Sequence, residues 1–255
     1  MIPTEEIEMK PSSHPPPERG SVLEQISTRW PLISDPLQFV LRYAPAARRY
    51  LSALVKDPHD AEDVAQTFLL HIVNRPFTPE QVPTGRFRDY LKAVLRNLAI
   101  THFRRTSRHV LHSANLDMLP DSHTEGHADG AWLAEWRQCL LQRAWEHLEE
   151  HEREAPHGLA YTVLRLAADH PDEDSAALAV RVSAQIGRPV RADAFRKQLS
   201  RARRRFAQLL VNEVRQTLER PRSADILDEL RDLGLIDYVR DFLPESFRDA
   251  NEPAP

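Results

Sequence analysis

Apolar side chains recur at every third or fourth position along most of this chain, a spacing that predicts amphipathic helices. The strongest repeats lie at 60–74 and 87–107, on either side of a polar loop that contains prolines. Asp60 is expected at the N-cap of the first repeat. An earlier helical pattern begins at Leu37 and contains Pro45, which we expect to kink or divide it. The three helices can share one core, whose expected residues in the two strongest repeats are Ala61, Val64, Ala65, Phe68, Ile72, Phe87, Leu91, Val94, Leu95 and Leu98.

Helical spacing returns in the second half of the chain. One helix is expected from about Ala131 to just before Pro156, and a shorter one at about 159–168. Two more helices follow, separated by Gly187, which can adopt the positive φ of a helix C-terminus. This pair predicts a helix-turn-helix. Its apolar positions are Ala176, Leu178, Val180, Val182 and Ile186 in the first helix, and Phe195, Leu199, Ala202, Phe206 and Leu209 in the second.

Composition agrees with an all-helical fold. The chain has only 7 Gly in 255 residues and is rich in Ala, Leu, Arg and Glu. We expect an all-α protein with two small helical domains joined by a flexible linker. The expected division is a mostly disordered tail at 1–36, a three-helix domain at 37–110, a linker at 111–130, a helix-turn-helix domain at 131–220 and a helical C-terminal extension at 221–255. The extension is expected to form a helical hairpin packed on the second domain.

Neither membrane insertion nor disulfide bonding is expected. No apolar run reaches the length of a membrane span, and the N-terminus has no apolar signal core. The single cysteine, Cys139, excludes a disulfide within the chain. These features indicate a cytoplasmic protein.

Charge is strongly segregated along the chain, although the net charge is only −4. The balance of Lys and Arg against Asp and Glu is +6 at 37–110 and +7 at 186–220. It is −10 at 111–180 and −5 at 221–255. Two basic blocks separated by an acidic one favour two contacts with nucleic acid over simple solvated faces. Three tryptophans lie in the acidic block and are expected to pack rather than to stack on bases, namely Trp132, Trp136 and Trp145.

The helix expected at 87–107 carries a basic stripe beside its apolar one. Arg88, Lys92 and Arg96 follow one another at a spacing of four residues, and Arg104 and Arg105 extend the run. A basic stripe on a helix that also carries aromatic residues suits a nucleic-acid backbone.

Two motifs stand out, D-A-E-D-V-A-Q-T-F-L at 60–69 and the sequence at 87–105. Together they resemble a known family, the bacterial RNA polymerase sigma factors. The first motif resembles the second conserved region of that family, although Thr67 stands where the family has Glu. The sequence at 87–105 resembles the helix that follows it in the extracytoplasmic-function (ECF) group. The resemblance implies polymerase binding by Asp60, Glu62, Asp63, Gln66, Thr67 and Leu70. It implies binding of the minus-ten promoter element by the loop at 76–86 and by the residues Arg86, Arg88, Tyr90, Lys92, Arg96, Asn97, Thr101, Arg104 and Arg105.

The sequence A-F-R-K-Q-L-S-R-A-R-R-R-F at 194–206 resembles the recognition helix of the fourth sigma region. The turn before it, at 187–190, is about two residues longer than is usual in the family, and the stretch 149–174 is longer and more acidic. The resemblance implies binding of the minus-thirty-five promoter element by Arg191, Arg196, Lys197, Ser200, Arg201 and Arg204.

The resemblance as a whole implies a transcription initiation factor. Its expected partners are core RNA polymerase and promoter DNA, and an anti-sigma factor is a further candidate. No enzymatic motif is present in the sequence, so we expect no enzyme, no metal and no other cofactor. Two alternatives remain open: a helix-turn-helix regulator that acts without polymerase, and a helical scaffold whose basic faces bind acidic proteins.

Overall fold

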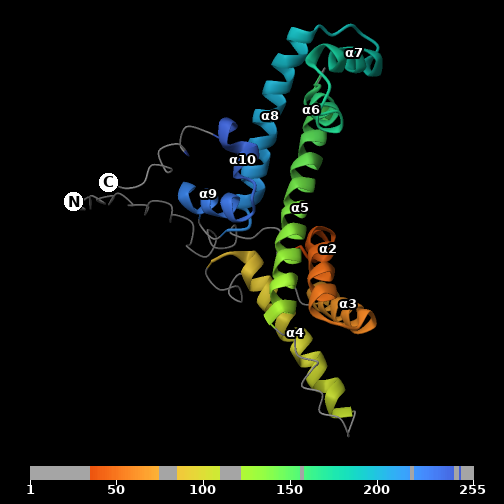
Figure 1. The fold of residues 1–255 in the computed structure, drawn as a ribbon, viewed down its shortest axis with the longest axis vertical. Helices are drawn as coiled ribbons and strands as arrows, with labels where there is room; N and C mark the ends of the chain where they lie inside the picture. The colour runs from red at the N-terminus through yellow and green to blue at the C-terminus, as the bar shows by residue number, and fades with distance from the viewer. Residues whose placement is uncertain are drawn as a thin grey trace, which may run out of the picture.

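The computed structural model describes the residues 35–74, 85–109, 122–155, 158–218, 221–243 and 247. Within these ranges every regular element is a helix, apart from an isolated β-bridge between Arg86 and Leu218. The all-α expectation is therefore confirmed. Two long helices, α5 (Ser122–Glu154) and α8 (Ala192–Arg215), lie side by side in opposite directions, and the remaining helices pack around them (Figure 1).

The first three described helices are α2 (Pro36–Leu54), α3 (Pro58–Asn74) and α4 (Phe87–His109). They bury most of the apolar positions expected from the sequence, but Val94 and Leu98 of α4 are only partly buried. Leu37, where the α2 pattern begins, and Leu41 are exposed, at 63% and 66%. Helix α2 continues through Pro45 as one helix. The expected cap of α3 is wrong by three residues. The Asp57 carboxylate accepts hydrogen bonds from the amides of His59 (2.7 Å) and Asp60 (3.1 Å), so Asp60 lies in the first turn.

Helix α5 begins nine residues earlier than the sequence pattern indicated, so 122–130 are helical and do not form a linker. The reason is tertiary packing. Ala128 and Trp132 are buried in the same core as α2, and the Trp132 ring meets Tyr50 edge to face at a centroid distance of 5.6 Å. This burial outweighs the poor helix propensity of the Ser, His and Gly residues nearby. Residues 110–121, residues 1–34 of the tail expected at 1–36 and most of the loop at 76–86 lie outside the described part of the chain. The last two positions of the expected tail, Asp35 and Pro36, are the N-cap and first residue of α2.

A second, smaller core lies at the far end of the long helices. It joins α6 (Ala160–Asp169), α7 (Ser175–Ile186) and the start of α8 (Figure 1). Gly187 ends α7 with φ 69°, which confirms the expected left-handed turn. Val180, expected to contribute to the apolar surface, is 69% exposed because it lies on the outer side of α7.

The C-terminal extension forms α9 (Ser223–Asp232), α10 (Ile236–Val239) and the 3-10 turn η3 (Arg240–Phe242). These elements pack on α8, as expected. Their apolar residues also join the large core that contains α2, α4 and α5. Residues of both expected domains therefore share one core in this structure.

Candidate protein-binding and nucleic-acid interfaces

The face of α3 opposite the core is polar and open to solvent. Glu62, Asp63, Gln66 and Thr67 are all exposed, whereas Val64 and Phe68 on the other side are buried. The face also carries an apolar residue, Leu70, which is 61% exposed. Val73 of the same helix is also 52% exposed. Exposed apolar side chains beside polar ones match the apolar centre and polar rim of protein interfaces.

A groove of about 570 Å³ runs between this face and α4. Its α3 wall includes Asp63, Gln66, Thr67 and Leu70, and its α4 wall includes Leu98, Thr101, His102 and Arg105. The Nε2 atom of His102 lies 3.0 Å from Asp60 Oδ1, which ties the two helices together. Asp60 therefore has a structural partner inside the protein, unlike the more exposed carboxylate of Asp63.

The sequence-predicted basic stripe of α4 divides into two parts in the structure. At its start, Arg88 is only 8% exposed and pairs with Glu229 of α9 through two hydrogen bonds, of 2.6 and 3.0 Å. Arg86 pairs with Glu229 at 3.0 Å and also with Asp232. Lys92 pairs with Asp129 of α5 at 3.2 Å. The expectation of a continuous free stripe is thus wrong for Arg88, whose side chain Glu229 covers. Lys92 and the neighbouring Arg86 are also paired with carboxylates but stay partly exposed.

The second part of α4 is open. Arg96, Asn97, Thr101, Arg104 and Arg105 lie on this part of the helix, which projects beyond the end of α5 (Figure 1). The Thr101 hydroxyl donates to the Asn97 carbonyl at 2.8 Å, so it is satisfied within the helix. The three arginines are exposed and accessible to a phosphate backbone.

Tyr90 is half-buried beside Phe87, with ring centroids 6.3 Å apart. Burial raises the pKa of its hydroxyl. The ring is thus packed against Phe87 but remains partly exposed to solvent.

The other basic surface lies on the first half of α8. All six sequence-predicted residues are exposed: Arg191 at the N-cap of α8, and Arg196, Lys197, Ser200, Arg201 and Arg204 within the helix. This surface lies at the opposite end of the molecule from the projecting half of α4 (Figure 1). The structure thus separates two basic surfaces by the length of the long helices.

A buried ion cluster that the sequence reasoning missed joins three helices. Arg42 of α2 pairs with Glu213 of α8, and Glu213 Oε1 lies 3.1 Å from His147 Nε2 of α5. Burial lowers the pKa of Arg42. No local pattern links residues this far apart in sequence, although a charged residue within an apolar repeat is a hint of a buried pair.

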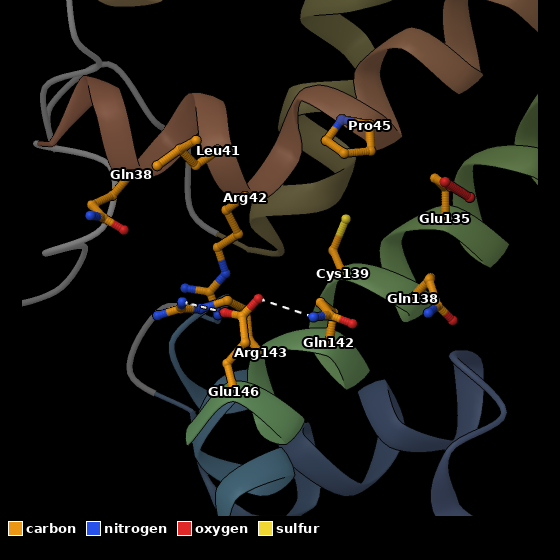
Figure 2. Close-up of a pocket in the computed structure, with 10 residues that line it drawn as sticks. All are labelled: Gln38, Leu41, Arg42, Pro45, Glu135, Gln138, Cys139, Gln142, Arg143 and Glu146. Atoms are coloured by element: carbon orange, nitrogen blue, oxygen red, sulfur yellow. Dashed lines mark hydrogen bonds and ion pairs between the residues drawn. The ribbon is translucent and has the colours of Figure 1, made fainter. Parts of the chain in front are cut away.

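Beside this cluster is a cavity of about 440 Å³ between α2 and α5. In Figure 2, Arg42 extends from α2 toward Arg143 and Glu146, whereas the Cys139 side chain points toward Pro45. Arg143 donates to Glu146 at 2.7 Å. Burial raises the Cys139 pKa to about 11, so this thiol stays protonated at neutral pH and is unsuited to nucleophilic chemistry.

The described residues offer neither a metal centre nor a membrane span. No group of three or more His, Cys, Asp or Glu side chains among them could hold a metal ion. None of the helices in the described part of the chain is long and apolar enough to cross a membrane.

Comparison with known proteins gives one match. Residues 39–109 match the family model described as Sigma-70 region 2, and this segment contains α3 and α4 and nearly all of α2. No curated protein matches the chain, and no solved structure matches it.

The described part of the chain is thus all-helical, and its segment 39–109 is similar to sigma-70 region 2. In this family, region 2 binds RNA polymerase and takes part in promoter melting. The match covers less than half of the chain and supports a sigma-70-type sigma factor.

Proposed function

We propose that this protein is a sigma factor of the ECF group that binds core RNA polymerase, carries it to promoters and helps to open the DNA. The observation that carries the proposal is the region 2 match at 39–109, which coincides with a helical unit that presents the polar face of α3. We assign polymerase binding to Asp63, Gln66, Thr67 and Leu70, with Glu62 at the edge of the same face.

Glu62 has intramolecular partners that reduce its availability. Its carboxylate accepts from Gln66 at 3.1 Å and lies 3.3 Å from Arg48. Both contacts are solvent-exposed and therefore weak, so a partner could exchange them at little cost.

The two basic surfaces would serve the DNA. Arg96, Asn97, Thr101, Arg104 and Arg105 would contact the minus-ten element, and the exposed basic residues of α8 would contact the minus-thirty-five element. Helices α7 and α8 with the turn at Gly187 have the order of a helix-turn-helix, in which the second helix enters the major groove. Promoter opening by such a protein needs no catalytic side chain. Tyr90 can hold an unstacked base, and the α4 cations can hold the separated backbone.

The direct test is reconstitution. The purified chain is mixed with core RNA polymerase, the complex is isolated, and run-off transcription is measured on genomic fragments. The proposal expects a stable complex and promoter-dependent transcripts. A chain that binds DNA but not core polymerase would instead be a helix-turn-helix regulator, and a chain that binds neither would support the scaffold alternative.

A further inference from the structure

Helix α9 presents two carboxylates to the start of α4. The Glu229 carboxylate is fully buried and receives Arg88 Nε at 2.6 Å and Arg88 Nη2 at 3.0 Å. Its Oε2 atom also lies 3.0 Å from Arg86 Nε. Asp232, one helical turn further on, pairs with Arg86 and lies 3.4 Å from Arg88 Nη2. Two guanidinium groups are therefore held by two carboxylates of the C-terminal extension.

Backbone contacts reinforce this arrangement. The Phe87 amide donates to the Thr217 carbonyl at 3.1 Å, and Arg86 forms a β-bridge with Leu218. The segment that leads into α4 is thus fixed to the segment between α8 and α9. Together with the side-chain pairs, these contacts hold α9 beside the start of α4.

The chemistry of the contact resembles that of a nucleic-acid backbone. A carboxylate accepts two hydrogen bonds from a guanidinium in the same forked geometry as a phosphate does. The extension at 221–255 carries a charge of −5, whereas the segment at 37–110 carries +6. An acidic helix tethered to the same chain also has a high effective concentration at its target.

We propose that α9 is an internal competitor for nucleic acid, with Glu229 and Asp232 occupying Arg86 and Arg88 in the place of backbone phosphates. The free protein is then a closed form, in which Arg86 and Arg88 are occupied while the distal half of α4 and the start of α8 stay open to DNA. Movement of α9 away from α4 exposes two more phosphate-binding groups. The inference rests on the proposed function only in taking the start of α4 as a nucleic-acid surface.

The test compares two charge reversals on α9. Asp232→Lys places a cation against Arg86 and Arg88 and should displace α9. Asp228→Lys is the matched control, because Asp228 is exposed and pairs at 2.6 Å with Arg231 of its own helix. Both variants change the net charge equally and keep the buried Glu229. Circular dichroism and thermal melting check that both remain folded.

The probe is a fluorescent duplex of mixed sequence, whose binding to the full-length chain is measured by anisotropy at several salt concentrations. Because each phosphate contact adds about 0.9 to the slope of log K against log salt, the Asp232→Lys variant should show a slope steeper by roughly 1 to 2 than the control. Its affinity at low salt should be about tenfold higher than that of the control. Adding Arg86→Ala to Asp232→Lys should remove part of this gain.

Equal slopes and affinities for the two folded Lys variants would overturn the competitor role of α9. A gain in Asp232→Lys that Arg86→Ala leaves intact would overturn it as well, because the gain would then come from another surface. Core polymerase binding is measured separately on the wild-type chain. If the wild-type chain binds polymerase but Asp232→Lys shows no gain in DNA binding, only the competitor role of α9 is wrong. If Asp232→Lys shows the gain but the wild-type chain does not bind polymerase, only the sigma-factor proposal is wrong.

Discussion

The indole of Trp136 stacks on the ring of Tyr43, with centroids 4.5 Å apart and ring planes 11° from parallel. Trp136 belongs to α5 and Tyr43 to α2, so this contact joins the matched region 2 segment to the helix that follows it. The rings also meet Phe87 of α4, at 5.7 Å from Tyr43 and 6.1 Å from Trp136. The start of α5 is therefore part of the core of this segment and does not act as a free connection.

This contact predicts a large stability effect. Trp136→Ala removes a fully buried indole, and we expect the free energy of unfolding to fall by about 3–5 kcal/mol. Gln138→Ala, on the exposed side of the same helix, should change it by no more than about 0.5 kcal/mol. Urea unfolding followed by circular dichroism measures both. Similar losses of stability for the two variants would show that α5 does not form part of this core in solution.

Local periodicity was sufficient to predict the core of α3. Ala61, Val64, Ala65, Phe68 and Ile72 were selected by helical spacing, and all five are buried. The burial of each residue depends on which side of its own helix it occupies, and helical spacing in the local sequence gives that side.

Features that depend on distant partners could not be predicted in this way. The helix at 122–130 depends on burial of Ala128 and Trp132 against α2, and its Ser, His and Gly residues resemble a linker when considered alone. Arg88 has the spacing of an exposed basic stripe, but its partner Glu229 is 141 residues away. Opposite charge balances at 37–110 and 221–255 were the one available hint.

The α3 cap predicts a pH effect. Hydrogen bonds from the amides of Asp60 and His59 hold the pKa of Asp57 below its ordinary value. A carboxyl whose pKa is lowered by folding stabilises the protein above its unfolded-state pKa, and this contribution disappears as the pH falls through the folded-state pKa. The stability advantage of the wild type over Asp57→Ala should therefore be constant near neutral pH and shrink below about pH 4.

Urea unfolding of both proteins from pH 7 to about pH 3 measures this difference. Asp35→Ala at pH 7 gives a comparison for the size of the capping effect, because Asp35 caps α2 with bonds of 3.0 and 3.2 Å from the amides of Leu37 and Gln38. If the stability advantage of the wild type over Asp57→Ala grew as the pH fell, the assignment of Asp57 as the cap would be wrong.

The Cys139 thiol offers a measure of local opening. Because burial raises its pKa to about 11, we expect very slow alkylation by iodoacetamide in the folded protein at pH 8. In urea the thiol should react at the rate of an ordinary cysteine. Mass spectrometry of timed samples measures both rates, and rapid labelling of the folded chain would show that α2 and α5 separate readily.

The exposed face of α3 predicts a selective decrease in polymerase binding. Asp63→Ala combined with Gln66→Ala removes two polar side chains from this face without touching the buried stripe, so the fold should be retained. We expect weaker binding to core polymerase and unchanged binding to mixed-sequence duplex DNA. Affinity for fluorescently labelled polymerase measures the first and anisotropy the second. Normal polymerase affinity in this variant would show that this face of α3 does not bind polymerase.

The basic start of α8 predicts the opposite pattern. Arg196 and Lys197 are exposed on the first half of this helix, away from the buried Phe195. Arg196→Ala combined with Lys197→Ala should lower the slope of log K against log salt by about 0.9 for each phosphate that the variant no longer binds. If Arg196 also reads a base edge, discrimination between promoter and mixed-sequence DNA should fall by roughly 1–3 kcal/mol. Polymerase affinity should stay unchanged, because both side chains lie far from α3 along the long helices (Figure 1).

The control is Arg215→Ala, which removes an exposed cation from the opposite end of α8. A 196/197 variant with the same salt slope as this control would show that α8 does not bind DNA through its N-terminal half.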